Sequence, residues 1–150
     1  MDDDIREFGE RLGRHCLARD WDQVHQLLAP WLRPTLTPDG VREFFEAEYR
    51  KTLDANDIPA MHYPEYPDPG VDGNGFMTAT KLREPISWEG DRVRDVPAEV
   101  TDANVRYWLK LQLLASDEQM EALGFDTFSE TWMSIVTTPE GLRVGYWEVS

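Results

Sequence analysis

The chain has 150 residues, enough for a single domain, 1–150, that buries roughly 70% of the surface exposed by its unfolded form. Its 29 acidic and 15 basic residues give a net charge of −14, which opposes nucleic-acid binding because such binding needs Lys and Arg at the phosphates. The single cysteine, Cys16, excludes an internal disulfide, and no stretch approaches the ~20 apolar residues of a membrane span, so we expect a cytoplasmic protein without a membrane partner.

The first half of the chain shows the residue spacing of helices. A first helix is predicted from Asp2, with one apolar stripe made by Ile5, Phe8, Leu12 and Cys16. A second, short helix follows from about Asp20, and Pro30 limits its length. At Thr37-Pro38-Asp39, a threonine cap, a proline at the first position and an acid in the first turn predict the start of a third helix.

Residues 56–75 interrupt this pattern, since they hold too many prolines for a helix or a central strand. We expect a Pro-rich loop that partly packs on the domain. Its end, Asp72-Gly73-Asn74-Gly75, resembles part of a calcium-binding loop, but the twelfth position is Lys81, where an acid must supply two oxygens. We therefore predict a glycine-rich turn, then a strand from Phe76 to Leu82 and a weaker strand at about 86–96.

The stretch from Val105 to Leu113 alternates between two sets of side chains, which predicts a strand with one buried face. That face is expected to comprise Val105, Tyr107, Leu109, Leu111 and Leu113. A short helix is expected at about 116–123. Residues 131–137 and 142–149 then predict a hairpin, because Thr138-Pro139-Glu140-Gly141 suits a three-residue loop with a glycine bulge.

Two tryptophans are expected on the outer face of this sheet. Trp108 lies opposite the leucines of its strand, and pairing Thr138 with Leu142 places Trp147 on the same side. Aromatic residues on an exposed face indicate a contact with a protein partner, or a homodimer formed through the sheet. Scattered apolar residues without a function are also common on protein surfaces, and that interpretation stays open.

Helices followed by strands indicate an α+β domain, in which N-terminal helices pack on a curved, mostly antiparallel sheet that ends in a hairpin. The segment from Leu17 to Pro30, followed by Leu36-Thr37-Pro38-Asp39-Gly40-Val41, is similar to the opening of nuclear-transport-factor-two-like (cystatin-like cone) domains. This resemblance implies a conical pocket between the helices and the sheet, and often a dimer. Because such folds host isomerases, dehydratases, ligand-binding proteins and interaction modules, the resemblance does not decide the function.

Motifs for chemistry are absent from the sequence. It carries no nucleophile elbow, phosphate-binding glycine loop, cysteine pair or paired metal-binding histidines, so we predict no catalytic residue, cofactor or metal. His62 could titrate near neutral pH in a loop over the cone pocket, beside Tyr63, and Tyr107 could face that pocket. A packed loop histidine is the competing interpretation. The inward face of the strand at 105–113 has no acid, which argues against an enzyme.

Two functions from different classes remain. The first is a non-catalytic cytosolic binding protein that uses its acidic surface and outer aromatic face to hold a protein partner, such as a basic toxin that it inhibits as an immunity protein. Its partner-binding residues would be Trp108, Trp147, Glu65, Asp68 and Asp72. The alternative is a small-molecule isomerase, dehydratase or ligand-binding protein that uses the cone pocket. A pocket filled by side chains favours the first function, and an open pocket with converging polar groups favours the second.

Overall fold

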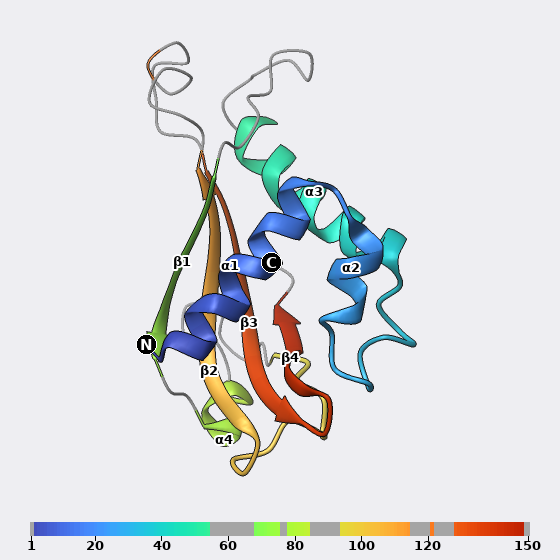
Figure 1. Cartoon of the computed structure of the whole chain (residues 1–150), viewed down its shortest axis with the longest axis vertical. Coiled ribbons are helices and arrows are strands. Elements are labelled where there is room, and N and C mark those ends of the chain that lie inside the picture. Colours follow the sequence, from blue (N-terminus) through green and yellow to red (C-terminus); the bar gives the residue numbers. More distant parts are fainter. Residues whose placement is uncertain are drawn as a thin grey trace.

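Three helices precede the first strand along the chain, as expected for the α+β class (Figure 1). The computed structural model describes residues 2–54, 68–75, 78–84, 94–114, 121 and 128–148, with side chains outside the description at 48–54, 68–74, 112–114 and 128–130. Its elements, in chain order, are α1 (Asp3–Leu17), α2 (Trp21–Gln26), α3 (Pro38–Asp54), β1 (Asp68–Gly75), α4 (Ala79–Leu82), β2 (Val105–Leu114), β3 (Phe128–Thr138) and β4 (Gly141–Glu148).

The three N-terminal helices begin where the sequence predicts them. The predicted apolar stripe of α1 is buried. At α2, the Asp20 carboxylate accepts a hydrogen bond from the Gln23 backbone N–H at 3.4 Å. At α3, Thr37 Oγ1 accepts one from the Gly40 backbone N–H at 3.1 Å. These side chains satisfy backbone donors that a helix start leaves without partners, which confirms the predicted starts of α2 and α3.

The described strands form one antiparallel sheet in the order β1-β2-β3-β4. The prediction of a loop through residue 75 is wrong at its end, because residues 68–75 form β1, an edge strand. An edge tolerates proline and glycine because only one of its sides has to pair. Gly75, with a φ of +83°, lies at a register shift in β1, which is where we expected only a turn.

Residues 79–82 form α4, so the predicted strand from Phe76 to Leu82 is wrong in its described part. Thr78 caps this helix by accepting a hydrogen bond from the Lys81 backbone N–H at 3.1 Å. Of the weaker strand predicted at 86–96, residues 94–96 are described and are not in a strand. Most of the helix predicted at 116–123 lies outside the described residues, and so do residues 56–67.

The hairpin between β3 and β4 is confirmed, but its turn is tighter than predicted. Thr138 pairs with Gly141, which leaves Pro139 and Glu140 as a two-residue turn. Thr138 Oγ1 accepts a hydrogen bond from the Glu140 backbone N–H at 3.1 Å and donates one to the Gly141 carbonyl at 2.9 Å. Gly141 has a φ of +102°, a conformation that glycine adopts without steric cost. Leu142 therefore pairs with Thr137 and not with Thr138.

Two irregularities change which residues face the helices. In β2 the register shifts between Val105 and Tyr107, and in β4 a shift leaves Gly145 as an extra residue between Val144 and Tyr146. One extra residue in a strand reverses the faces of the side chains that follow it. Val105 therefore packs with the outer cluster, although the alternation placed it with the inner leucines.

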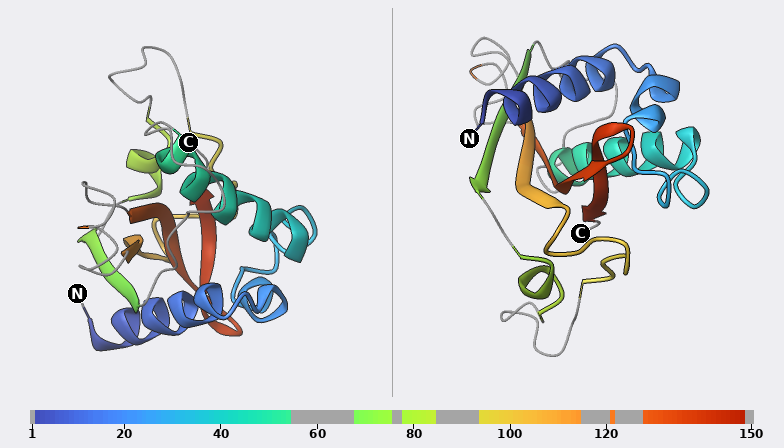
Figure 2. Two further views of the ribbon diagram at one scale, coloured as in Figure 1. Left: turned by 90° about the horizontal axis from the view of Figure 1, so that it is seen from above. Right: turned by 60° about the horizontal axis from the view of Figure 1, so that its bottom comes forward.

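Two apolar clusters lie on opposite faces of the sheet. The inner cluster joins α1, α2 and α3 to inward-facing strand residues such as Leu109 and Met133. The outer cluster contains Leu82 of α4, Val100, and outward-facing residues such as Trp108. Figure 2 shows α1 and α4 on opposite sides of the strands in its right-hand view. Both faces of the sheet are therefore covered, which explains why the strands carry apolar residues on each side.

The free edge of β4 is covered by the segment after α2. The Ala29 backbone N–H donates to the Val144 carbonyl at 2.8 Å, and the Val144 N–H donates to the Leu27 carbonyl at 2.9 Å. Trp31 Nε1 donates to the Gly145 carbonyl at 2.8 Å. A Cβ atom added at Gly145 would lie 2.6 Å and 2.9 Å from the two methyl carbons of Val136, and 3.3 Å from the Trp31 ring. Only glycine fits at this position without movement of its neighbours.

We predict that Gly145→Ala lowers the free energy of unfolding by about 1–3 kcal/mol, because the added methyl group overpacks this contact. Denaturant unfolding measures the change. In a Val136→Ala background the same substitution should cost less, since both clashing methyl groups are gone, although Val136→Ala carries a cost of its own. Equal costs of Gly145→Ala in the two backgrounds would contradict the explanation.

Candidate functional site

Among the described residues, a cluster of buried apolar side chains lies between the helices and the inner face of the sheet. Phe8, Leu12, Leu109, Met133 and Trp147 belong to this cluster, and each is at most 5% exposed. Tyr107, predicted to face a cone pocket, lies in the same cluster and is 9% exposed. In the part of the chain that the structure describes, this interior has side chains where the resemblance implied a ligand pocket.

The histidines and the cysteine that are described take part in packing. His25 Nε2 lies 2.9 Å from the Arg33 carbonyl oxygen, to which it donates a hydrogen bond as the Nε2–H tautomer. His15 is half-buried on α1. Burial raises the pKa of the Cys16 thiol to about 12, which keeps it protonated and a poor nucleophile at neutral pH. His62 and Tyr63, the other predicted pocket residues, lie outside the described residues.

The prediction that Trp108 and Trp147 lie together on the outer face is wrong for Trp147. The extra residue at Gly145 turns Trp147 inward, where it joins the helical cluster, and turns Tyr146 outward. Trp108 does lie on the outer face, but both tryptophans are only 4% exposed. Of the predicted acidic partner-binding residues, Asp68 and Asp72 lie in β1 and Glu65 lies outside the described residues.

Aromatic rings stack around Trp108 on the outer face. Its ring centroid is 5.6 Å from that of Trp132 and 6.3 Å from that of Tyr146, with nearly parallel planes. Arg94 lies over the Trp108 ring at 5.9 Å and pairs with Glu148 at 2.6 Å. This ion pair joins the segment before β2 to the end of β4. The cover over Trp108 is therefore built from the same chain, and the indole is not available to a partner in this conformation.

We predict that Trp108→Ala and Trp147→Ala each destabilise the fold by about 3–5 kcal/mol, because each removes a large buried side chain. Denaturant unfolding measures the loss. Trp21→Ala, at a half-buried position on α2, should cost less. If the replacement of either buried tryptophan left stability unchanged and altered only self-association, that tryptophan would not be part of the apolar packing described above.

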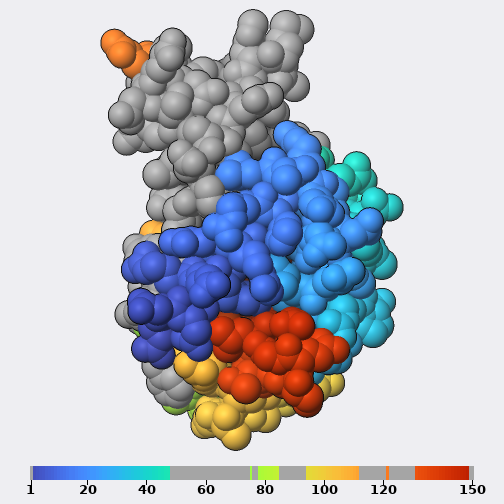
Figure 3. Space-filling model, viewed as in Figure 1, coloured from blue at the N-terminus to red at the C-terminus, as the bar shows by residue number. Residues whose placement is uncertain are grey.

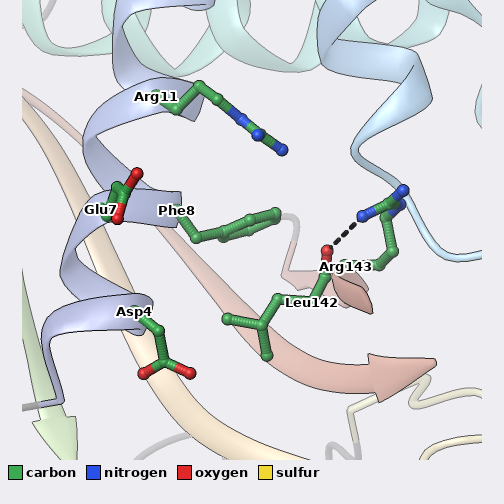
Figure 4. Close-up of a pocket in the computed structure, with 6 residues that line it drawn as sticks. All are labelled: Asp4, Glu7, Phe8, Arg11, Leu142 and Arg143. Carbon is green, nitrogen blue, oxygen red and sulfur yellow. Dashed lines mark hydrogen bonds between the residues drawn. The ribbon is translucent and has the colours of Figure 1, made fainter. Parts of the chain in front are cut away.

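A concave site lies between α1 and the start of β4, two elements that Figure 3 shows side by side at the surface. The hollow has a volume of about 260 Å³. It is lined by Asp4, Glu7, Phe8, Arg11, Leu142 and Arg143. Figure 4 shows the Phe8 ring between Arg11 and Leu142, with Arg143 beside Leu142. Asp4 and Glu7 lie on the N-terminal part of the same helix, α1. Nothing in the sequence pattern indicated this site, because its two sides come from opposite ends of the chain.

A second hollow, of about 300 Å³, lies beside α4. Its lining includes Asp102, Thr80 and Arg83. The Asp102 carboxylate accepts a hydrogen bond from the Ala79 backbone N–H at 2.6 Å, and Arg83 donates to the Pro97 and Val100 carbonyls at 2.7 Å and 2.6 Å. Asp102 and Arg83 are therefore already hydrogen-bonded to backbone groups, and their role is to hold α4 and the segment before β2 together.

An ion pair ties the turn of the hairpin to the segment after α2. Arg33 donates to both carboxylate oxygens of Glu140 at 2.9 Å. This bidentate contact lowers the pKa of the Glu140 carboxyl and raises the pKa of the Arg33 guanidinium. Arg143 Nε lies 3.5 Å from the same carboxylate, which it shares with Arg33. Glu140 is therefore a structural anchor beside the α1–β4 hollow.

We predict that the ion pair contributes stability that depends on pH in a defined direction. Because the pKa of Glu140 is lowered from its usual 4.5, the contribution is complete above that value and is lost as pH falls through the lower pKa of the folded chain. The stability difference between the parent chain and Glu140→Gln should therefore be constant at neutral pH and shrink below about 4.5. Urea unfolding across the pH series measures it.

The control for this experiment is Glu43→Gln, which removes one negative charge from α3 and leaves the Arg33–Glu140 pair in place. It corrects for the general effect of net charge on stability. A difference between Glu140→Gln and the parent chain that grows as pH falls below 4.5 has the wrong sign and would refute the assignment.

Comparison with known proteins leaves this chain without a match among protein-family models, curated proteins or solved structures. Among the described residues, no group of three or more His, Cys, Asp or Glu side chains is placed to hold a metal ion. None of the described helices is long and apolar enough to cross a membrane. The surfaces and the apolar packing of the described residues are therefore the observations from which a function has to be argued.

Proposed function

We propose that this chain is a non-catalytic binding protein that holds a basic protein partner on its acidic surface. The observation that supports the proposal is the apolar packing that the described residues form between the helices and the sheet, where an enzyme or ligand-binding protein of cone-like architecture would need an open pocket. An inhibitor or immunity protein that neutralises a basic toxin domain binds its partner through a surface and does not need an open pocket.

The charge of the chain supports a basic partner. The net charge is −14, and exposed acids occur at the start of α1 and on α2 and α3, at Asp3, Asp22, Asp39 and Glu43. Arginines offset part of this charge, as in the Arg19–Glu46 pair at 3.3 Å. The excess of acids attracts a positively charged protein and accelerates its encounter, because opposite fields steer two molecules together before they touch.

The alternative function is a small-molecule isomerase, dehydratase or ligand-binding protein of the nuclear-transport-factor-two-like (cystatin-like cone) superfamily. The order of elements supports this membership, since three helices precede an antiparallel sheet. Of the residues that would form its site, Tyr107 is packed in the inner cluster, while His62 and Tyr63 lie outside the described residues. A homodimer formed through the sheet belongs to the same proposal, and native mass spectrometry of the purified chain tests it.

The test of the proposed function begins with affinity purification from the native cell and identification of the bound protein by mass spectrometry. The purified partner is then used in stopped-flow measurements of association. We predict that the association rate falls steeply as salt shortens the screening length from ~10 Å to ~3 Å, while dissociation changes less.

Two matched triple variants locate the acidic surface that the partner uses. The first is Glu65→Gln/Asp68→Asn/Asp72→Asn, and the second is Asp22→Asn/Asp39→Asn/Glu43→Gln. Each removes three negative charges and keeps the side-chain size, so a slower association with one set and not the other identifies the contacting face. An association rate that is indifferent to salt and to both sets would refute capture by charge. A specific small-molecule ligand that depends on His62 or Tyr107 would favour the alternative function.

A further inference from the structure

We propose that the hollow between α1 and the start of β4 binds a small monocarboxylate with an apolar body. This site lies at the surface edge of the inner cluster, to which Phe8 belongs, and it goes beyond the proposed function. Its ligand is defined by chemistry: one carboxylate on an aliphatic or aromatic group, either as a free acid or as the C-terminal residue of a peptide. Arg11 and Arg143 provide the positive charge in this hollow, Phe8 and Leu142 provide its apolar surface, and Asp4 and Glu7 provide its acidic end.

The two arginines supply positive charge that the surrounding residues do not fully neutralise. Arg11 lies 5.9 Å from the ring centroid of Phe8, and it has no ion pair among the described residues. Arg143 donates to the Leu142 carbonyl at 2.7 Å, and its Nε lies 3.5 Å from the Glu140 carboxylate, which it shares with Arg33. The nearest carboxylate, Glu140, already accepts two hydrogen bonds from Arg33.

Two guanidinium groups that line one hollow are matched to a carboxylate. Guanidinium N–H groups and carboxylate oxygens form short charge-assisted hydrogen bonds, which are stronger than those between neutral groups. Figure 4 shows the Arg11 side chain extending past the Phe8 ring toward the side on which Arg143 lies, with Arg143 hydrogen-bonded to the Leu142 carbonyl. A carboxylate placed there would accept from both side chains. The net charge of −14 opposes any anion at long range, but salt screens remote charges beyond about 8 Å at physiological ionic strength.

The floor and the size of the hollow define the rest of the ligand. Phe8 and Leu142 lie beneath the arginines, so an apolar group attached to the carboxylate has apolar side chains to contact. The volume of about 260 Å³ is below the range of about 300–1,000 Å³ that is usual for drug-sized ligands. The hollow therefore suits a small acid or the last residue of a peptide, and not a large cofactor.

The acidic end of the hollow makes the site selective for a single negative charge. Asp4 lies 3.6 Å from Arg106, which partly neutralises it. Glu7 lines the hollow without an ion pair among the residues described. A second carboxylate on the ligand would approach these acids and be repelled, because like charges at short range oppose each other. A monocarboxylate is therefore expected to bind more tightly than a dicarboxylate of similar length.

Three small probes test the chemistry of the ligand. Hexanoate presents the carboxylate and an apolar body, hexanamide keeps the shape without the charge, and adipate adds a second carboxylate. Ligand-observed NMR titration should give a Kd of about 1 mM for hexanoate, in keeping with so few ligand atoms. Hexanamide and adipate should each bind several-fold more weakly. Equal binding of hexanoate and hexanamide, or no binding of hexanoate, would overturn the proposal.

Matched arginine substitutions on α1 test the location. Arg11→Gln should weaken hexanoate by about five- to tenfold, as expected for a lost charge-assisted hydrogen bond. Arg6→Gln is the control, because Arg6 is exposed on the same helix and does not line the hollow. Arg143→Lys tests the β4 side of the hollow without removing its positive charge. It should also weaken hexanoate binding, because lysine lacks the planar guanidinium group that can donate two parallel hydrogen bonds to a carboxylate. Equal effects of Arg11→Gln and Arg6→Gln would refute this location.

A pair of peptides distinguishes the two sources of the carboxylate. A short peptide that ends in leucine with a free carboxylate is compared with the same peptide ending in an amide. Tighter binding of the free-carboxylate peptide than of hexanoate identifies a chain terminus as the ligand, and binding of hexanoate alone identifies a small acid. Both results support the site. Because these titrations contain no protein partner, they succeed or fail independently of the proposed capture of a basic protein.

Discussion

The close approach of Val136 and Trp31 to the Cα atom of Gly145 is the constraint on which much of this fold depends. It lets β4 carry one extra residue while the strand stays bonded to β3 on one side and to Leu27–Ala29 on the other. Because of that residue, Tyr146 and Trp147 exchange faces. One aromatic side chain then completes the helical core, and the other completes the stack around Trp108. A single position without a Cβ atom thus links the two faces of the sheet.

The first three helices and the strongest strand could be predicted from the sequence because their signals are local. Asp20 and Thr37 cap helices through hydrogen bonds that span three residues, and β2 is visible as a long alternation. Alternation fails at a bulge, since the extra residue at Gly145 leaves no local mark other than a glycine. The edge strand β1 was also missed, because proline and glycine have opposite meanings at an edge and in a central strand.

The candidate sites were less accessible to sequence reasoning than the fold. The outer aromatic face was predicted from register alone. The expected pairing of Thr138 with Leu142 sets Met133 opposite Trp147, as the structure does, but these two residues belong to the inner cluster and not to the outer face. The hollow beside α1 was not predicted at all. Arg11 and Arg143 lie far apart in the sequence, and only the packing of the hairpin against the helix brings them to one hollow. Such a site forms only when distant parts of the chain pack together, so no residue spacing in the sequence predicts it.

The two edges of the sheet differ in how they meet another chain. At β4, Leu27–Ala29 occupies backbone groups of Val144 that a foreign strand would need. Among the described strands, β1 pairs with β2 alone, yet its sequence contains Pro69, which lacks an N–H group to donate. One edge is closed by pairing and the other is discouraged by composition, and both devices oppose uncontrolled edge-to-edge growth. Neither edge that the structure describes therefore offers a foreign strand an uninterrupted row of free backbone groups.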